Sequence, residues 1–445
     1  MDQSFMKKRK IWGLVLTMSI PNVLSMLVNS LYNIVDSFFV AQINEDAMTA
    51  LSLVFPVQNL INSIAIGFGV GVNAVIALHL GAKKDKNANI SATYGILLSA
   101  IHGVLLTIIS ILIMPWFLGL FTDNTQVMEM GVEYSTVVFM FSLPISISMT
   151  LEKIFQAVGR MKTSMFVIIM GCITNIVLDP ILIFGLGLVK PMGIGGAALA
   201  TGIGQTVVFA LYIIIYFAKP INVKISFKNL FYKKGIIKQL YFIGIPATLN
   251  MALPSLLVSA LNAILASFSQ IYVVILGIYY KLQTFVYMSS NGIIQGIRPL
   301  VGYNYGAGEY ARVKKIYRVS LILSASIMTV GTLLCLIIPN KLMAMFSANP
   351  QTIGAGSEAL RIISIGFIVS AVSICSSGAL EGLGKGLPSL IISLLRYVVV
   401  IIPIAFVLSK IVGAAGVWHA FWITEFIVAA ISYILYKRVF KTKRI

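Results

Sequence analysis

Long apolar stretches recur along the whole chain, and they restrict its fold more than any other feature. Each stretch has about 20 residues or more between short polar breaks, which is enough for a helix to cross a hydrocarbon core about 30 Å thick. Hydrophobic residues make up 58% of the chain and charged residues 11%, whereas charged residues are about 25% of a soluble domain. The sequence therefore predicts a protein that lies mostly in lipid.

We expect the stretches to be helices because they are apolar on every face, whereas the strands of a membrane barrel alternate and have about ten residues. The predicted fold class is an all-α polytopic membrane protein with twelve transmembrane helices. The expected spans are residues 12–42, 47–79, 91–120, 127–155, 163–187, 193–218, 237–268, 272–303, 313–345, 351–380, 388–411 and 414–438.

The net charge of +19 would suit a nucleic-acid partner, but the distribution of the basic residues favours membrane orientation. Most Lys and Arg residues lie at the termini and in the loops after even-numbered spans, such as Lys83 and Lys314. The opposite loops hold only Lys190, Lys341 and Lys410. By the positive-inside rule, both termini are predicted to lie in the cytoplasm, and we expect no nucleic-acid partner.

Residues that carry catalysis or bind metals form no recognisable group. Three cysteines lie inside predicted spans without paired spacing, and three histidines are scattered. A glycine-rich segment at residues 378–386 lacks the Ser or Thr that follows the lysine of a phosphate-binding loop. We therefore expect a protein that is not an enzyme and that needs no cofactor.

The two halves of the chain repeat each other at a spacing of about 225 residues. Each repeat contains an even number of spans, so both halves share one orientation and are related by an axis along the membrane normal. This predicts two pseudo-symmetric six-helix lobes, with substrate between them. The aligned pairs include Ile20-Pro21 with Ile245-Pro246, Gly67 and Gly71 with Gly292 and Gly296, and Asn124 and Gln126 with Asn349 and Gln351. The predicted domains are an N-lobe (1–218), a cytoplasmic linker (219–236) and a C-lobe (237–445).

Two aspartates interrupt predicted spans in the first repeat only. Asp36 aligns with Leu261, and Asp179 aligns with Ile402 or Ile404. A carboxylate deep in a bilayer costs about 2.5 to 3.5 kcal/mol on insertion scales, so it normally faces a bundle interior and marks an ion or proton path. The two aspartates are therefore the first candidates for function.

Helical geometry places both aspartates at a similar depth. At 1.5 Å per residue, Asp36 lies about 9 Å inside the outer end of its span, and Asp179 and Thr201 lie about 12 Å inside theirs. Asn175 and Tyr32 each precede an aspartate by four residues and share its helix face. The oxygens of Asp36, Asp179, Asn175 and Thr201 form a hard-ligand set that suits Na⁺, and the carboxylates also suit H⁺, so both ions stay open. A structural alternative is that each aspartate caps a helix break, such as the one expected at Pro180.

The segment Asn175-Ile-Val-Leu-Asp179-Pro180, followed by Gly196-Ala-Ala-Leu-Ala-Thr201, resembles spans 5 and 6 of the multidrug and toxic compound extrusion family. Ile20-Pro21 and Tyr32-Asn-Ile-Val-Asp36 resemble its first span. The resemblance covers essentially all twelve spans. It implies an antiporter of the prokaryotic cell (inner) membrane that exports cationic, amphipathic drugs or toxic metabolites by alternating access. It also implies coupling to H⁺ or Na⁺ through Asp36, Asn175, Asp179 and Thr201.

The second half carries fewer features of that family. Some branches use acidic residues in spans 7 and 10, where this chain has neutral residues near Pro254 and Val372. Lys281 and Glu425 lie about 14 Å and 18 Å from the outer ends of their spans, which predicts an ion pair. Arg298 and Arg396 lie toward the cytoplasmic side and are expected to snorkel.

The alternative function is a flippase for lipid-linked or polysaccharide substrates, which would need a basic cleft. The N-lobe aspartates favour small organic cations as substrates, whereas Lys281 and Arg298 leave the flippase open. The remaining expected partner is the lipid bilayer, and the protein is expected to be a monomer.

Overall fold

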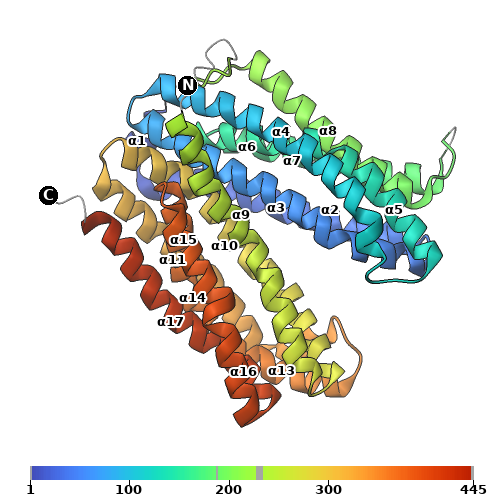
Figure 1. Ribbon diagram of the computed structural model, residues 1–445. Helices are drawn as coiled ribbons and strands as arrows, with labels where there is room; N and C mark the ends of the chain where they lie inside the picture. Colours follow the sequence, from blue (N-terminus) through green and yellow to red (C-terminus); the bar gives the residue numbers. More distant parts are fainter. Residues whose placement is uncertain (1–2, 187–188, 227–233, 442–445) are drawn as a thin grey trace. The chain divides into compact units, whose positions relative to one another are not determined.

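The structure is a computed structural model that describes residues 3–186, 189–226 and 234–441, and this part of the chain contains helices and no strand (Figure 1). Within it, ten helices are long and apolar enough to cross a membrane, and one of these, Gly386–Val412, contains a π-helical turn that divides it into three elements. Two further pairs of helices pass the same test together, and they are bent by 47° and 53°. The twelve predicted spans correspond to these ten helices and two bent pairs, so the predicted all-α polytopic membrane fold is confirmed.

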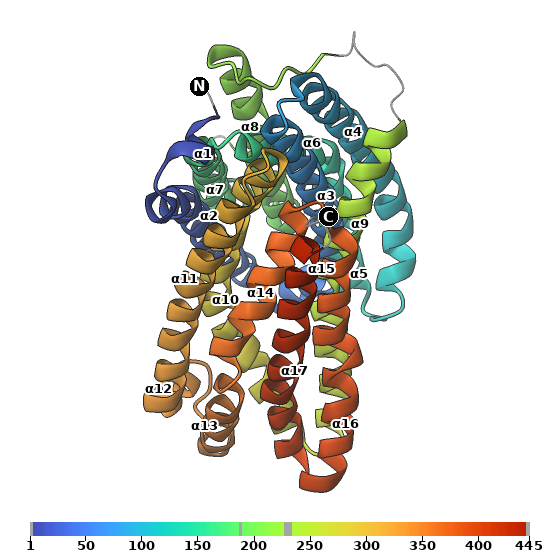
Figure 2. The ribbon, with the colours of Figure 1, turned by 90° about the vertical axis from the view of Figure 1, so that its left-hand side faces the viewer.

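The helices follow the order of the predicted spans. Those of the first half are α1 (Phe5–Lys8), α2 (Ile11–Ala41), α3 (Glu45–Gly81), α4 (Asp85–Leu118), the bent pair α5 (Thr125–Met140) and α6 (Ser142–Ala157), α7 (Met161–Phe184) and α8 (Gly193–Ala218). Those of the second half are α9 (Lys234–Ala266), α10 (Gln270–Gly306), α11 (Tyr310–Ile337), α12 (Pro339–Ala344), the bent pair α13 (Pro350–Ser364) and α14 (Phe367–Gly382), α15 (Gly386–Leu394), the π-helical turn η2 (Leu395–Val399), α16 (Ile401–Val412) and α17 (Ala414–Lys441) (Figure 2).

The chain forms two compact units. Unit 1 comprises Met1–Gln3 and Leu24–Thr248, and unit 2 comprises Ser4–Val23 and Leu249–Ile445. The start of α2 therefore belongs to unit 2, and the start of α9 belongs to unit 1. The predicted division into 1–218, 219–236 and 237–445 does not include this exchange of helix starts between the units. A repeat shows which segments are equivalent, but it does not show which segments they pack against. Residues 227–233 of the predicted linker lie outside the described residues.

Glycines explain how the starts of α2 and α9 pack. In unit 1, a Cβ atom at Gly71 of α3 would lie 2.4 Å from the carbonyl oxygen of Leu240 in α9. In unit 2, a Cβ atom at Gly296 of α10 would lie 2.7 Å from the carbonyl oxygen of Met18 in α2. Without a side chain, the backbones of two membrane helices can approach closely. Gly71 and Gly296 are equivalent in the repeat, so both units use the same contact.

The repeated Asn-x-Gln stretch also has a structural role. The Asn124 side-chain oxygen accepts a hydrogen bond from the Gln126 backbone N–H at 2.9 Å, and Asn349 accepts one from Gln351 at the same distance. Both asparagines are N-caps, of α5 and α13, which satisfy N–H groups that have no partner within the helix. This similarity between the halves therefore reflects helix capping.

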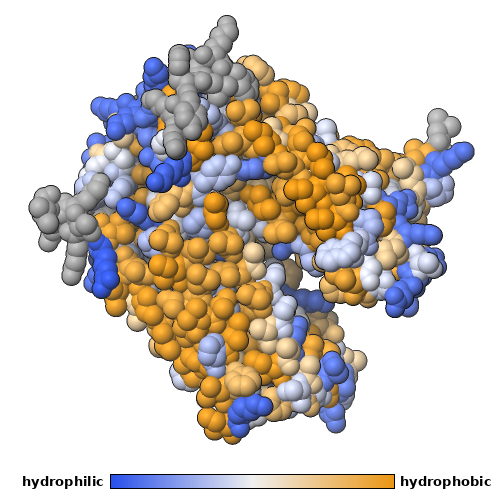
Figure 3. All heavy atoms as spheres, in the orientation of Figure 1, coloured by the Kyte–Doolittle hydropathy of each residue, from blue (hydrophilic) through white to orange (hydrophobic). Residues whose placement is uncertain are grey.

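Exposed apolar side chains follow one face of α4. Ile101, Leu105, Ile108 and Leu112 recur at three- and four-residue spacing, and their exposed fractions run from 46% to 73%. Figure 3 shows hydrophobic residues over broad areas of the surface, with hydrophilic residues near the ends of helices. Apolar surfaces of this extent are unfavourable in water, and they fit a protein whose helices face lipid.

Candidate functional site

The predicted ion site lies in unit 1, where α7 and α8 pack closely. A Cβ atom at Gly204 of α8 would lie 3.0 Å from the carbonyl oxygen of Gly171 and 3.3 Å from Cβ of Asn175, both in α7. A Cβ atom at Gly196 would lie 2.5 Å from the carbonyl oxygen of Leu182. These glycines bring the two backbones together, so that polar side chains on the facing sides can meet.

Asn175 and Thr201 form the hydrogen bond that joins the two helices at the site. Asn175 Nδ2 donates to Thr201 Oγ1 at 3.2 Å, and the two residues are only 2% and 5% exposed. The other amide atom, Asn175 Oδ1, has no hydrogen-bond partner among the described residues. A buried acceptor without a donor is costly, so this oxygen is available to a cation.

The two aspartates are buried in the same unit without donors. Asp179 is fully buried one turn after Asn175, and Asp36 of α2 is 7% exposed. Both oxygens of Asp179, and Oδ1 of Asp36, have no hydrogen-bond partner within the described part of the chain. An ionised carboxylate in such surroundings needs a positive charge or a proton. These oxygens are therefore the part of the predicted ion site that most needs a proton or a cation.

Tyr32 connects these groups. Its hydroxyl lies close enough to Thr201 for a hydrogen bond and close enough to Asp36 and Asp179 for an electrostatic interaction. The structure thus brings Tyr32, Asp36, Asn175, Asp179 and Thr201 into one region of unit 1. Their role in ion binding remains a prediction.

The donor atoms of this region fit a hard cation. Two carboxylates, an amide oxygen and a hydroxyl are all oxygen ligands, which Na⁺ prefers over nitrogen or sulfur. Groups of three or more His, Cys, Asp and Glu side chains that could hold a metal do not occur among the described residues. The set is therefore better suited to a weakly held monovalent ion or a proton than to a transition metal.

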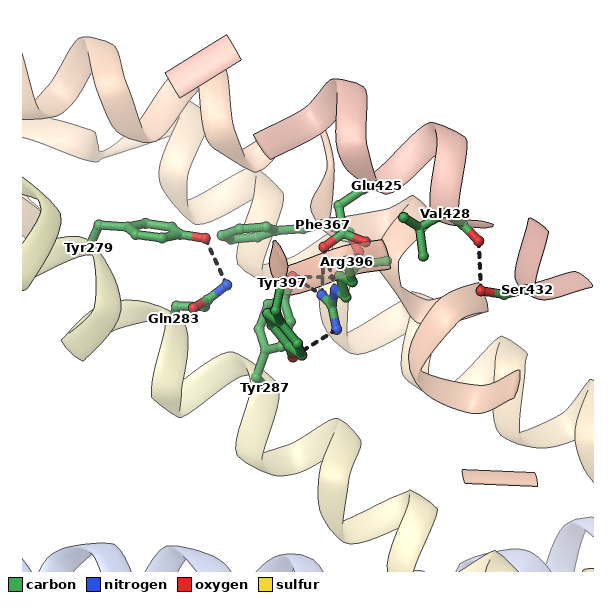
Figure 4. Close-up of polar contacts among 10 residues, drawn as sticks. Tyr279, Gln283, Tyr287, Phe367, Arg396, Tyr397, Glu425, Val428 and Ser432 are labelled. Carbon is green, nitrogen blue, oxygen red and sulfur yellow. Dashed lines mark hydrogen bonds and ion pairs between the residues drawn. The ribbon is translucent and has the colours of Figure 1, made fainter. Parts of the chain in front are cut away.

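A buried ion pair in unit 2 differs from the predicted one (Figure 4). Arg396 Nη2 and Nε lie 2.6 Å and 2.7 Å from Glu425 Oε1. Glu425 was expected to pair with Lys281, which is instead exposed, with Nζ 5.7 Å from the centre of the Phe346 ring. The estimate failed because depth along a helix does not give the direction of a side chain around it. Arg396 also lies in the π-helical turn η2, which changes the direction of its side chain relative to a regular helix.

The prediction that Arg298 and Arg396 snorkel is wrong, because both arginines pair with a glutamate that is largely buried. Arg298 Nη2 lies 2.7 Å from Glu381 Oε2, and Asn250 Nδ2 and the Ser389 hydroxyl donate to the other oxygen, Oε1, at 2.9 Å and 3.1 Å. Unit 1 has a comparable buried pair, in which Lys153 Nζ lies 2.8 Å from Glu152 Oε1. In each pair the buried charge is balanced by a neighbour, which a charge inside a membrane helix requires.

Known proteins match this chain along its length. The MatE family model matches residues 21–181 and 246–407, which together make up more than half of the chain and fall in both repeats. The chain belongs to the MatE family. It is therefore a multi-span membrane transporter, and the resemblance to the multidrug and toxic compound extrusion family is confirmed.

Several relatives of this MatE-family transporter carry names that describe their function. The multidrug export protein MepA of Staphylococcus haemolyticus is 26% identical over 431 residues, which cover 96% of this chain and 94% of the relative. MepA of Staphylococcus aureus is 25% identical over 427 residues, which cover 95% and 92%.

Solved structures show the same fold. An outward-facing multidrug resistance MATE family transporter of the MOP superfamily matches with a TM-score of 0.94 and 23% identity, and the match covers 100% of this chain and 99% of the other. A MOP superfamily transporter from Pyrococcus furiosus matches with a TM-score of 0.92 and 22% identity over 98% of both chains. The MatE-family chain therefore has the two-lobe helical fold of these transporters.

Proposed function

We propose that this transporter exports cationic, amphipathic drugs or toxic metabolites across the cell membrane in exchange for H⁺ or Na⁺. The observation that carries the proposal is the pair of buried aspartates in unit 1, whose three oxygens without hydrogen-bond donors need a positive charge. The names of the MepA relatives, which are multidrug export proteins, support small organic molecules as substrates.

The coupling ion and the organic cation are exchanged because both are attracted by the negative charge of Asp36 and Asp179. When H⁺ or Na⁺ binds Asp36 and Asp179, the buried site becomes neutral and the closed packing around it is stabilised. When the ion leaves, the charged carboxylates favour a state that admits water or an organic cation. A transporter that alternates between two such states moves the ion and the substrate in opposite directions.

The flippase alternative has less support from the second half of the chain. Arg298 and Arg396, two of its basic residues inside spans, are each neutralised by a glutamate. Arginines held in this way do not provide the free positive charge that a phosphate-bearing substrate needs. Lys281 is exposed, and its Nζ lies 5.7 Å from the centre of the Phe346 ring.

The test is efflux of ethidium from proteoliposomes, with Na⁺ and pH gradients imposed separately on the wild type, Asp36→Asn and Asp179→Asn. Asn has nearly the shape of Asp but cannot hold a proton or balance a cation, so we expect both variants to lose gradient-driven efflux. Asp123→Asn, at an exposed aspartate of the same unit, is the control and should transport normally. Efflux that is indifferent to both buried aspartates would refute the antiporter and would favour the flippase.

A further inference from the structure

The Arg396 side chain lies between aromatic rings in unit 2. Its Cζ atom is 5.4 Å from the centre of the Tyr287 ring and 5.3 Å from that of Tyr397. Its Nη2 and Nη1 donate to the hydroxyls of the same two tyrosines, both at 3.3 Å, and Phe367 packs edge-on against Tyr287 (Figure 4). Together with Glu425, these rings form an aromatic box with a carboxylate, an arrangement that proteins use to bind organic cations.

Arg396 contacts only one of the two carboxylate oxygens of Glu425. Both short contacts from Arg396 go to Oε1, whereas Ser373, whose hydroxyl is neutral, lies close enough to donate a hydrogen bond to the carboxylate. A carboxylate can accept about four hydrogen bonds through its two oxygens, so Glu425 retains unused capacity for positive charge. A purely structural pair would gain from bidentate contacts to both oxygens, which are absent from this pair.

The surroundings of Arg396 provide another acceptor. The Tyr280 hydroxyl interacts electrostatically with Arg396, is buried, and has no hydrogen-bond partner within the described residues. π-helical turns such as η2 occur frequently at functional sites. The repeat supports the same conclusion. Arg396 aligns with Gly171 or Ile173 of the first half, depending on where the gap is placed, so the charge is not part of the shared scaffold.

We propose that this aromatic box is a second binding site for the transported organic cation and that Arg396 is its built-in competitor. A planar aromatic monocation takes the place of the guanidinium between Tyr287 and Tyr397, with its charge against Glu425. When the site is empty, Arg396 fills it, and when substrate is bound, the returning arginine promotes release. The inference rests on the proposed export of organic cations and adds a substrate site outside unit 1.

The test is equilibrium binding of ethidium to the purified full-length protein in lipid nanodiscs, measured by fluorescence anisotropy without any ion gradient. Arg396→Gln removes the competitor and should tighten binding about tenfold, whereas Glu425→Gln removes the attracting charge and should weaken it about tenfold. Arg298→Gln removes a different buried arginine and should leave the affinity unchanged. Equal losses in Arg396→Gln and Glu425→Gln would show a purely structural pair and would overturn the proposal.

A second variant protects the test against misfolding of Arg396→Gln, which leaves a buried carboxylate unpaired. Tyr397→Leu keeps both charges and removes one aromatic face, so it should weaken ethidium binding by about threefold to tenfold, with little change in melting temperature. Unchanged affinity in this variant would refute the aromatic box. The assay contains no gradient, so loss of ion coupling in Asp36→Asn or Asp179→Asn would be seen in efflux and is distinguishable from failure here.

Discussion

Gly196 tests whether close packing of α7 and α8 positions the candidate ion site. In Gly196→Ala, the new Cβ atom would lie 2.5 Å from the carbonyl oxygen of Leu182, 2.7 Å from its carbonyl carbon and 3.0 Å from the backbone nitrogen of Ile183. All three are backbone atoms, so no side chain can rotate away. The two helices must therefore separate, and Thr201, five residues after Gly196, moves with α8.

The size of the effect can be estimated from three contributions. Overpacking of a tight interface costs about 1 to 3 kcal/mol. The bond from Asn175 to Thr201 is already 3.2 Å long, and a shift of a few tenths of an ångström breaks it, at about 1 kcal/mol. Alanine returns about 1 kcal/mol because it is a better helix former than glycine. The bond loss and the helix gain cancel, so the expected net loss of stability is about 1 to 3 kcal/mol, and a value near 3 is expected because backbone atoms cannot yield.

The assay combines thermal melting of the detergent-solubilised protein with ethidium efflux from proteoliposomes. Gly277→Ala is a matched control, because a Cβ atom at this position of α10 meets no atom within 4 Å. We expect Gly196→Ala to melt several degrees lower and to lose gradient-driven efflux, whereas Gly277→Ala melts at or above the wild-type temperature. If the two variants melt alike and transport alike, the inferred role of helix packing at the site is wrong.

Two further predictions concern the coupling ion and the N-terminal segment. Asn175→Ala removes an oxygen ligand that Na⁺ would use and H⁺ would not, so it should reduce Na⁺-driven efflux at least tenfold and spare H⁺-driven efflux; equal effects on both would contradict an amide ligand. Lys7 Nζ lies 2.8 Å from Glu309, and its hydrogen bond lowers the pKa of that carboxyl below the usual range. The pair is therefore complete at neutral pH and is lost as the pH falls through the lowered pKa. After correction for the intrinsic pH dependence of amide exchange, the protection of the α1 amides should decrease over that pH range, and Glu309→Gln should abolish this decrease. Protection that still falls with pH in this variant would exclude the pair as its cause.

Hydropathy was sufficient to predict the spans but not their bends. The breaks fall at Phe141 and at Ile365–Gly366, which are equivalent places in the two repeats. Apolar composition continues through each break, so the sequence indicates one span where the structure has two helices at an angle. A bend between two apolar helices does not require polar residues, so the composition of the segment does not reveal it.

The candidate site shows the same division between what the sequence can and cannot predict. Four-residue spacing correctly placed Asn175 one turn from Asp179, because helical periodicity fixes which neighbours share a face. Pairing between different helices also depends on the rotation of each helix, so Glu425 was assigned to the wrong partner. Comparison of the repeats could have marked Arg396 as unusual, since it aligns with an uncharged residue, Gly171 or Ile173, just as Asp36 aligns with Leu261.

The exchange of helix starts gives this single polypeptide the connectivity of a domain-swapped dimer. The chain passes from one unit to the other at Val23–Leu24 and again at Thr248–Leu249, which are equivalent positions of the repeat. A chain cut between residues 219 and 236 would yield two fragments, each carrying a segment that completes the unit of the other. Each half of the chain thus supplies a segment to the compact unit that is formed mainly by the other half, so the contacts within each unit depend on both halves.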